Sequence, residues 1–470
     1  MEKTKVGIVG LGTVGSGVAK LLLDFGDRTA RHAGRTLWLE QVVVRDVNKP
    51  RDCELPKGVL SDDLTKITEN PEITTVAQLV GGLEPARTIM IKLLESGKHV
   101  VTANKALLAE HGPELFDLAR ELGRSIAFEA SVAGGIPIIA NISQCLSANQ
   151  IESLTAILNG TSNFILSQME EQEWTYAEAL KEAQRLGYAE ADPTMDVDGT
   201  DTAQKLAILS HLAFGARVHW RDIPRRGIDT LDVADMYYAK ELGYRIKLLA
   251  VAELEPDGLE LHVSPTLVKI GTPLAEVRGA FNAISVVGDA VGPVFFHGLG
   301  AGQMPTASAV VADMIDTVVG RTAITFRTLE LWSQREALVK PRDPAKISGR
   351  YYLRLNVEDR PGVMAEITGV LGRRGISIAS VIQHEPSAED ATMVPLVIIT
   401  HRTTEGDTEA AIAEIERLPA VRSVGRTSSP STADATIAGE SEKRPGRRTR
   451  GPSYENGANR AGIVRMRIRD

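Results

Sequence analysis

The sequence predicts an α/β protein that begins with a Rossmann-type sheet, continues into an α+β domain and ends in a small ferredoxin-like domain. Three observations lead to this prediction. A glycine-rich turn follows the first predicted strand, strands and helices alternate up to residue 129, and residues 351–424 follow a β-α-β-β-α-β order. Alternation of this kind is typical of a parallel sheet, whereas the mixed order that follows it indicates a separate sheet.

The first motif is a glycine turn between a strand and a helix. Residues 5–9 form an apolar strand, and Val18, Leu21 and Leu22 give the next segment helical periodicity. Strand, glycine turn and helix in this order are the context that a dinucleotide-binding fingerprint requires, because the pyrophosphate lies on the helix N-terminus. The alternative is a structural turn. The predicted cofactor-binding residues of this turn are Gly10, Leu11, Gly12, Thr13, Val14 and Gly15.

The second predicted strand, residues 39–44, ends at Arg45 and Asp46. An acidic residue near this point binds the ribose hydroxyls of NAD, whereas an arginine suits the 2′-phosphate of NADP. Both residue types are present, so the cofactor is NADP or NAD. Arg45 favours NADP, and the alternative is a solvent-exposed arginine at a strand end.

Further along, strands at residues 75–80 and 99–102 continue the parallel sheet, and Ala103, Asn104 and Lys105 follow the second of them. Polar residues just past the carboxyl end of a strand lie where such sheets bind ligands. Lys105 is therefore a candidate anchoring or catalytic residue, although position alone favours a lysine that merely begins a helix. After a strand at 126–129, residues 130–137 form a glycine-containing turn, and spacing alone favours a tight turn there.

Beyond Pro137 the strands at residues 151–158, 248–253, 259–268 and 283–287 predict a second sheet. The polar turn at 159–163 either faces a substrate or caps a helix. A glycine-rich run ending at Gly302 precedes a helix at 307–319, where a backbone without side chains allows close approach of a cofactor.

The segment from Ala183 to Lys205 is rich in acidic residues and ends in a lysine. Helical periodicity resumes after Gly199, so Asp201 and Lys205 lie at positions i and i+4 on one face of a helix. The simplest interpretation is a surface salt bridge. The alternative is that carboxylates hold an ammonium group at a cleft as an acid/base for a carbonyl or alcohol. The acidic residues of this segment are Glu190, Asp192, Asp196, Asp198 and Asp201.

This segment closely resembles the homoserine dehydrogenase signature. The matching positions are Ala183, Gly187, Asp192, Pro193, Asp196, Val197, Gly199, Asp201 and Lys205. The segments around Lys105 (TANKALLA) and Gly302 (GLGAGQMPTASAVVADM) also resemble that family.

The resemblance implies reversible oxidation of L-homoserine to L-aspartate 4-semialdehyde with NAD or NADP, a step towards threonine and methionine. It implies that Lys205 is the acid/base held by Asp201, and that Lys105 binds substrate or cofactor and shares in catalysis. Glu190 would bind the substrate ammonium, helped by Asp196, with Gly187 in the same site and Gly302 at the cofactor. It also implies a sodium ion bound by Glu129, Val132, Gly134 and Ile136.

The C-terminal layout, with the motif DRPGVMAEI, resembles the ACT domain, a regulatory module that usually senses amino acids. Asp359 and Gly362 would lie at its ligand site, and the family expectation is inhibition by L-threonine. The alternative is an oligomerisation module of ferredoxin-like form. Apolar strands in the middle domain and this module together predict a homodimer or homotetramer.

The predicted organisation follows from these segments. The expected parts are an NAD(P)-binding domain at 1–137 plus about 303–326, a substrate-binding and dimerisation domain at 138–302, a linker at 327–349, the ACT domain at 350–426 and a disordered tail at 427–470.

Composition excludes several other classes. The 470 residues carry a net charge of −8, which gives no electrostatic case for nucleic acid, and no apolar run approaches the ~20 residues of a membrane span. With a strand starting at once and only two cysteines, we expect a cytoplasmic protein. Two rivals remain: aspartate-semialdehyde dehydrogenase, which needs a nucleophilic cysteine, and a non-catalytic sensor of NADP and amino acid. Cys53 lies in a polar loop, and Cys145 is expected to be a buried, inert thiol.

Overall fold

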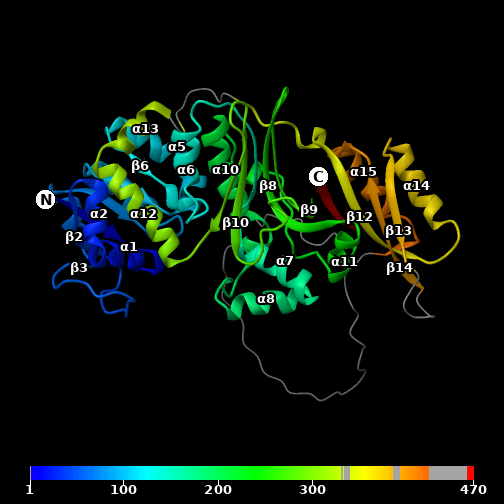
Figure 1. Ribbon diagram of the computed structural model, residues 1–470, viewed down its shortest axis with the longest axis horizontal. Coiled ribbons are helices and arrows are strands. Elements are labelled where there is room, and N and C mark those ends of the chain that lie inside the picture. Colours follow the sequence, from blue (N-terminus) through cyan, green and yellow to red (C-terminus); the bar gives the residue numbers. More distant parts are fainter. Residues whose placement is uncertain (1, 330–331, 333–338, 385–391, 423–462) are drawn as a thin grey trace, which may run out of the picture. The chain divides into compact units, whose positions relative to one another are not determined.

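The computed structural model describes residues 2–329, 332, 339–384, 392–422 and 463–470 (Figure 1). Internal contacts divide the chain into a first unit, Met1–Ile347 with Met466–Asp470, and a second unit, Ser348–Arg465. In the described part of the chain, no helix is both long and apolar enough to cross a membrane.

The first unit begins with a six-stranded sheet in the order β3-β2-β1-β4-β5-β6, and every neighbouring pair is parallel. This order reverses between β1 and β4, and ligands of such sheets bind at the carboxyl ends of the strands around that point. The strands are β1 (Lys3–Val9), β2 (Thr36–Val43), β3 (Leu60–Ser61), β4 (Ile73–Gln78), β5 (His99–Thr102) and β6 (Ile126–Ala127).

Helices pack on this sheet around a core that joins distant parts of the sequence. Ala307, Val310 and Met314 of α12 share one apolar cluster with Val6 and Val18. Helix α12 lies against α1 (Figure 1), and Gly17 allows this contact, because a Cβ there would approach the Ala307 side chain to 2.9 Å. The helices are α1 (Thr13–Asp24), α2 (Gly26–Ala33), α3 (Thr65–Thr68), α4 (Ala86–Glu95), α5 (Lys105–Glu121), α12 (Gln303–Val318) and α13 (Arg321–Leu329).

A second sheet follows in the same unit, with antiparallel strands in the order β11-β10-β7-β8-β9. Strand β11 was not predicted from the sequence, and its side chains alternate between half-buried and exposed. The strands are β7 (Ile151–Ile157), β8 (Tyr244–Glu255), β9 (Gly258–Lys269), β10 (Phe281–Gly288) and β11 (Gly292–Leu299).

Helical segments of varied length lie before, between and after these strands. They are η1 (Glu129–Ser131), α6 (Ile138–Ala140), η2 (Asn141–Cys145), α7 (Gly160–Gln172), α8 (Tyr176–Arg185), α9 (Thr194–Val197), α10 (Thr200–Phe214), η3 (Trp220–Asp222), α11 (Val233–Glu241) and η4 (Pro344–Lys346). The last residue of η2, Cys145, is exposed, so the expectation of a buried thiol is wrong. An apolar-looking stretch of sequence does not determine which side of a short helix faces the core.

The second unit has the predicted β-α-β-β-α-β order, with β14 between β12 and β13. Both helices bury apolar side chains in one core, among them Ile367, Leu371 and Ile415. Its elements are β12 (Ser348–Glu358), α14 (Val363–Arg373), β13 (Ile378–Gln383), β14 (Met393–Thr400), β15 (Thr403–Thr404), α15 (Glu405–Ile415) and β16 (Val421–Arg422).

The last strand corrects one expectation. Residues 427–470 were expected to be disordered, but Ile463–Arg469 form β17, which pairs in parallel with β9 from Arg467 to Arg469. Its residues alternate apolar and basic, which is a strand period, and Arg467 donates to Glu260 at 3.1 Å. The tail as a whole is polar, and the alternation of apolar and basic residues is confined to its last few positions, so the composition of the tail did not predict a strand. The remainder of the predicted tail, up to residue 462, lies outside the described residues.

Candidate active site

The glycine turn after β1 has a separate physical role at each position. Gly10 has φ +98°, and a Cβ there would meet the Leu79 backbone at 2.9 Å. A Cβ on Gly15 would lie 2.2 Å from the Gly10 carbonyl oxygen, so both positions exclude side chains. A Cβ on Gly12 would meet nothing within 4 Å. This open space at the N-terminus of α1 is where the backbone of a dinucleotide-binding turn approaches a pyrophosphate.

A cavity of about 860 Å³ lies at the carboxyl ends of β1, β2 and β4. Its volume is in the range of small-molecule and cofactor sites. The lining residues are Val9, Gly10, Leu11, Gly12, Thr13, Ser16, Val43, Val44, Arg45, Asp46, Lys49, Pro50, Arg51, Asp52, Asp62, Leu64, Val80, Pro85, Ile89 and Gln303.

Most of the cofactor residues predicted in the glycine turn line this cavity, as does Arg45, whereas Val14, Gly15, Lys105 and Gly302 are not part of its lining. Gly15 packs against the backbone of Gly10 and does not face the cavity. Gln303, the residue after Gly302, lines the cavity instead. The part of the lining that the sequence did not predict is the loop from Lys49 to Asp52, because its contact with the strand ends is a tertiary feature.

Lys105 begins α5 directly after β5, and its neighbour Asn104 fixes the turn. Asn104 Oδ1 accepts a hydrogen bond from the Leu107 backbone at 3.0 Å, which caps the helix. Its Nδ2 donates to the carbonyl oxygens of Val80 at 3.0 Å and Gly82 at 2.7 Å. The side chain of Lys105 is therefore presented from a rigid strand-to-helix junction.

The three predicted catalytic residues lie together, with two lysines on the carboxylate of Asp201. Lys105 Nζ lies 2.9 Å from Asp201 Oδ1, and Lys205 Nζ lies 2.7 Å from Asp201 Oδ2. The side chain of Asp201 is 6% exposed and that of Lys205 is 12% exposed, whereas that of Lys105 is 37% exposed. The cluster links α5, which follows a strand of the parallel sheet, to α10, which lies between strands β7 and β8 of the second sheet in the sequence.

Burial and charge act differently on the pKa values of the three groups. Burial by itself would raise the pKa of Asp201, but Lys205 and Lys105 outweigh it and hold that pKa below its ordinary value. The charge of Asp201 raises the pKa of Lys105. Burial lowers the pKa of Lys205, against the opposing charge of Asp201. Lys105 therefore remains an ammonium group, whereas Lys205 is the lysine that gives up a proton more readily.

Asn159, just before α7, joins a second carboxylate to this cluster. Its Nδ2 donates to Asp196 Oδ1 at 2.8 Å and to Asp201 Oδ2 at 2.9 Å. Burial raises the pKa of Asp196, and the hydrogen bond from Asn159 opposes that shift. The preceding residue, Leu158, accepts a hydrogen bond from Lys205 Nζ at 2.7 Å through its carbonyl oxygen. The polar turn at 159–163 was a candidate from the sequence, whereas the Leu158 carbonyl oxygen was not, because no residue type indicates the role of a backbone carbonyl.

The other predicted substrate residues lie in the loop after α8. Gly187 has φ +78° and is exposed, and Glu190 is also exposed. The loop contacts the polar turn through Thr161, whose hydroxyl donates to the Tyr188 carbonyl oxygen at 2.6 Å. Glu190 makes a minor contribution to raising the pKa of Lys105. Asp196 thus contacts the Lys105–Asp201–Lys205 cluster through Asn159, whereas Glu190 acts on it only through its charge.

The predicted sodium residues lie in the turn between β6 and α6. The carboxylate of Glu129 accepts hydrogen bonds from the backbone of Ile139 at 2.9 Å and Ala140 at 2.8 Å. Burial raises the pKa of Glu129 to about 7 despite these bonds. Within the described residues, no group of three or more His, Cys, Asp or Glu side chains has the arrangement of a metal site.

Transfer of a hydride to or from an alcohol needs a nucleotide cofactor and a group that moves one proton. The first unit contains a dinucleotide-type turn opening into a cavity, and a largely buried lysine with a lowered pKa beside a carboxylate. The fold and the side chains define an NAD(P)-dependent oxidoreductase.

Comparison with known proteins makes this class specific. A family model described as the homoserine dehydrogenase NAD-binding domain matches residues 10–129, a model described as homoserine dehydrogenase matches 137–315, and a model described as the ACT domain matches 351–420. A homoserine dehydrogenase of Pseudomonas aeruginosa is 46% identical over 90% of this chain and 97% of its own length. The corresponding protein of Bacillus subtilis is 40% identical, over 91% and 98%. The chain belongs to the homoserine dehydrogenase family.

Solved structures agree with this assignment. A homoserine dehydrogenase from Thiobacillus denitrificans superimposes with a TM-score of 0.84 at 42% identity, covering 100% of this chain and 99% of its own. A hyperthermophilic archaeal homoserine dehydrogenase in complex with NADPH has a TM-score of 0.55 at 26% identity, over 67% of this chain and 97% of its own.

Proposed function

We propose that this chain reversibly oxidises L-homoserine to L-aspartate 4-semialdehyde with NAD or NADP, in threonine and methionine biosynthesis. The observation that carries the proposal is the convergence of Lys105 and Lys205 on the two oxygens of Asp201. When bound, the nicotinamide accepts the hydride from the carbinol carbon, and the protein must take the hydroxyl proton.

Lys205 is the proposed general base for oxidation and general acid for the reverse reaction. An ammonium group has three N–H bonds, and Asp201 Oδ2 and the Leu158 carbonyl oxygen accept two of them. The third position is left for the substrate oxygen. In its neutral form the same nitrogen has a lone pair there, which accepts the hydroxyl proton.

Lys105 is proposed to act as a fixed positive charge that holds substrate or cofactor, because Asp201 stabilises its charged form. It is more exposed than Lys205, which suits contact with a bound ligand. Glu190 would bind the substrate ammonium, with Asp196 assisting and Gly187 giving the loop its turn. Gly302 and the glycine turn after β1 would contact the cofactor.

For the cofactor, the positive charges on the cavity wall support NADP. Arg45 and Lys49 both line the cavity beyond β2, where a 2′-phosphate would lie. Arg51 is directed at the backbone carbonyl oxygens of Val47 and Lys49. Arg45 is therefore the proposed 2′-phosphate ligand.

A sodium ion is proposed at the turn of Glu129, Val132, Gly134 and Ile136. The Glu129 carboxylate is occupied by two backbone N–H groups, so backbone carbonyl oxygens would supply most of the ligands. Ala133 with φ 53° and Gly134 with φ 22° give the turn a left-handed course that can direct successive carbonyls to one side. The residues fit an oxygen-only site for a hard cation. Its proposed role is to hold the turn in shape.

The second unit is proposed to bind L-threonine as an effector, near Asp359 and Gly362. Gly362 has φ +94° and precedes α14, which is the strand-to-helix turn that the family resemblance assigns to the ligand. A homodimer or homotetramer is proposed because Val291, Phe295 and Leu299 are exposed along the edge strand β11 and its turn. We place the protein in the cytoplasm.

The two rival functions find less support. An aspartate-semialdehyde dehydrogenase needs an activated cysteine, and neither Cys53 nor Cys145 takes part in the Lys105–Asp201–Lys205 cluster. A non-catalytic sensor would not require a largely buried lysine with a lowered pKa beside a carboxylate.

The test is nicotinamide absorbance during incubation of the purified protein with L-homoserine and NAD or NADP, with and without L-threonine. Homoserine-dependent reduction is expected, faster with NADP. Folded protein that binds the cofactor and reduces none of it would contradict the proposal.

A further inference from the structure

The turn from Leu158 to Gly160 contacts both members of the proposed acid/base pair. The Leu158 carbonyl oxygen accepts from Lys205 Nζ at 2.7 Å, and Asn159 Nδ2 donates to Asp201 Oδ2 at 2.9 Å. The backbone of Gly160 packs closely on that of Ala280, because a Cβ at position 160 would lie 2.7 Å from the Ala280 carbonyl oxygen. The turn is a fixed support beside a salt bridge whose two members are both on α10.

The amide of Asn159 has a defined orientation. Its Oδ1 accepts from the Ser162 backbone at 2.8 Å, which caps α7, so Nδ2 must face the carboxylates. One Nδ2 hydrogen is donated to Asp196 Oδ1 and the other to Asp201 Oδ2. Asn159 is buried, so these donors are not exchanged for water. The amide thus separates two carboxylates that would otherwise repel each other.

We propose that Asn159 is a positioning residue for proton transfer, which holds Asp201 against Lys205 and keeps Asp196 apart from it. The proposal rests on the role given above to Lys205. Free rotation of the Asp201 carboxylate would turn Lys205 away from the substrate oxygen and change the charge it experiences. Correct geometry of this kind is a condition for efficient general acid/base catalysis.

A cap without a catalytic consequence is the competing explanation, and two variants separate the roles. Asn159→Asp has nearly the same shape and retains a good capping oxygen, but it sets a carboxylate oxygen against Asp196 and Asp201. Asn159→Ser also caps well, is neutral and is too short to reach either carboxylate. Thr175→Ala removes a cap from another helix, α8, and serves as the control for cap loss alone.

The measurement is the pH profile of kcat and kcat/KM for homoserine oxidation, with homoserine KM, cofactor Kd and Tm for each variant. For Asn159→Asp we expect kcat to fall at least ~10-fold. We also expect the acidic limb to move to higher pH by about one unit or more, because added negative charge stabilises the Lys205 ammonium. For Asn159→Ser, which adds no charge, we expect a smaller fall in kcat and a smaller shift of the limb to higher pH, because Asp201 loses the N–H group that offsets part of its charge. Cofactor Kd should change less than ~3-fold in both, and Thr175→Ala should keep the wild-type profile.

If the acidic limb of the pH profile stays at its wild-type position in Asn159→Asp, the proposal is overturned, whether or not kcat or Tm falls. A purely structural role would lower kcat and Tm without moving that limb. A shifted limb with unchanged kcat overturns it as well. If Asn159→Asp does not fold, Asn159→Ser decides by the same two criteria. Failure of the underlying assignment is separate, since it would be seen as a Lys205→Ala enzyme that retains turnover.

Discussion

Lys205 lies one helical turn after Asp201 on α10, and its Nζ donates a hydrogen bond to Asp201 Oδ2 at 2.7 Å. An exposed i,i+4 pair is worth only a few tenths of a kcal/mol, but both members of this pair are largely buried. Burial favours a neutral lysine and the carboxylate favours a charged one, so the two effects leave the pKa of Lys205 below its ordinary value. That balance makes the lysine suitable for exchanging a proton with an alcohol.

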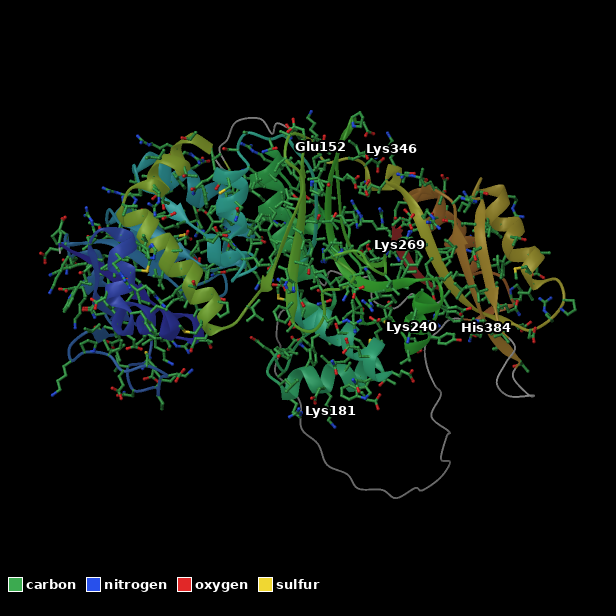
Figure 2. The ribbon with its side chains drawn as sticks, in the orientation of Figure 1. Glu152, Lys181, Lys240, Lys269, Lys346 and His384 are labelled. Atoms are coloured by element: carbon green, nitrogen blue, oxygen red, sulfur yellow. The ribbon has the colours of Figure 1, made fainter. Side chains whose placement is uncertain are left out.

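Lys205→Ala should lower kcat for homoserine oxidation by ~10²–10⁴-fold, the usual loss on removing a general acid/base. Cofactor binding should persist, because Lys205 does not line the cofactor cavity. Initial rates together with fluorescence titration of NADPH measure the two effects. Lys181, exposed on α8 in Figure 2, is the matched lysine, and Lys181→Ala should leave both unchanged. Near-normal turnover of Lys205→Ala would refute the assignment.

Asp201→Asn should lower kcat by about 10²-fold or more and move the acidic limb of the pH profile to lower pH. The direction follows because the charge of Asp201 raises the pKa of both lysines, and the amide removes that charge. Steady-state rates across pH test it. A limb that stays in place or moves upward would show that Asp201 does not control the lysine that limits the rate.

Arg45→Ala should raise KM for NADP by about 10-fold while leaving KM for NAD nearly unchanged, because a charge-assisted contact with phosphate contributes ~1.5–3 kcal/mol. Initial rates with each cofactor at saturating homoserine measure the change. Arg35, at the opposite end of β2 and outside the cavity lining, provides the control substitution Arg35→Ala. Equal loss with both cofactors would exclude a specific contact with the 2′-phosphate.

His211 should make stability depend on pH between about 4 and 6.5. Its buried ring stacks on Trp332 at 4.7 Å, and burial lowers its pKa to about 4. A folded-state pKa below the unfolded value means that the unfolded chain binds more protons in this window. Stability is therefore complete above pH 6.5 and is lost as the pH falls towards 4, by roughly 3 kcal/mol. Urea unfolding at several pH values should show a shallower dependence in His211→Gln, and parallel curves would contradict the prediction.

Arg467→Ala should destabilise the first unit by about 3–5 kcal/mol, because it leaves the largely buried Glu260 without its partner in β17. Adding Glu260→Gln should recover part of that loss, since the uncompensated charge is then gone. Denaturation of wild type, both single variants and the double variant gives the coupling energy. Strictly additive effects would mean that the pair does not stabilise this strand.

The sequence by itself determined the order of helices and strands where hydrophobic periodicity and turn residues mark them clearly. The glycine turn after β1, the i,i+4 pair of Asp201 and Lys205, and the β-α-β-β-α-β order of the second unit follow from periodicity and from residues with special conformations. Family resemblance indicated the substrate, and it is the basis for expecting a sodium site and a catalytic role for Lys105, which spacing did not predict.

Only the tertiary structure decided which distant residues meet. Nothing local to Lys105 indicates that its ammonium lies on the same carboxylate as Lys205, and nothing local to Leu158 marks its carbonyl oxygen as a lysine ligand. The same holds for β17, whose pairing with β9 depends on acidic partners some two hundred residues earlier. Local sequence specifies periodicity and helix caps. Burial and charge pairing between distant segments arise only when the chain is packed. Burial and charge pairing then set the pKa values on which the chemistry depends.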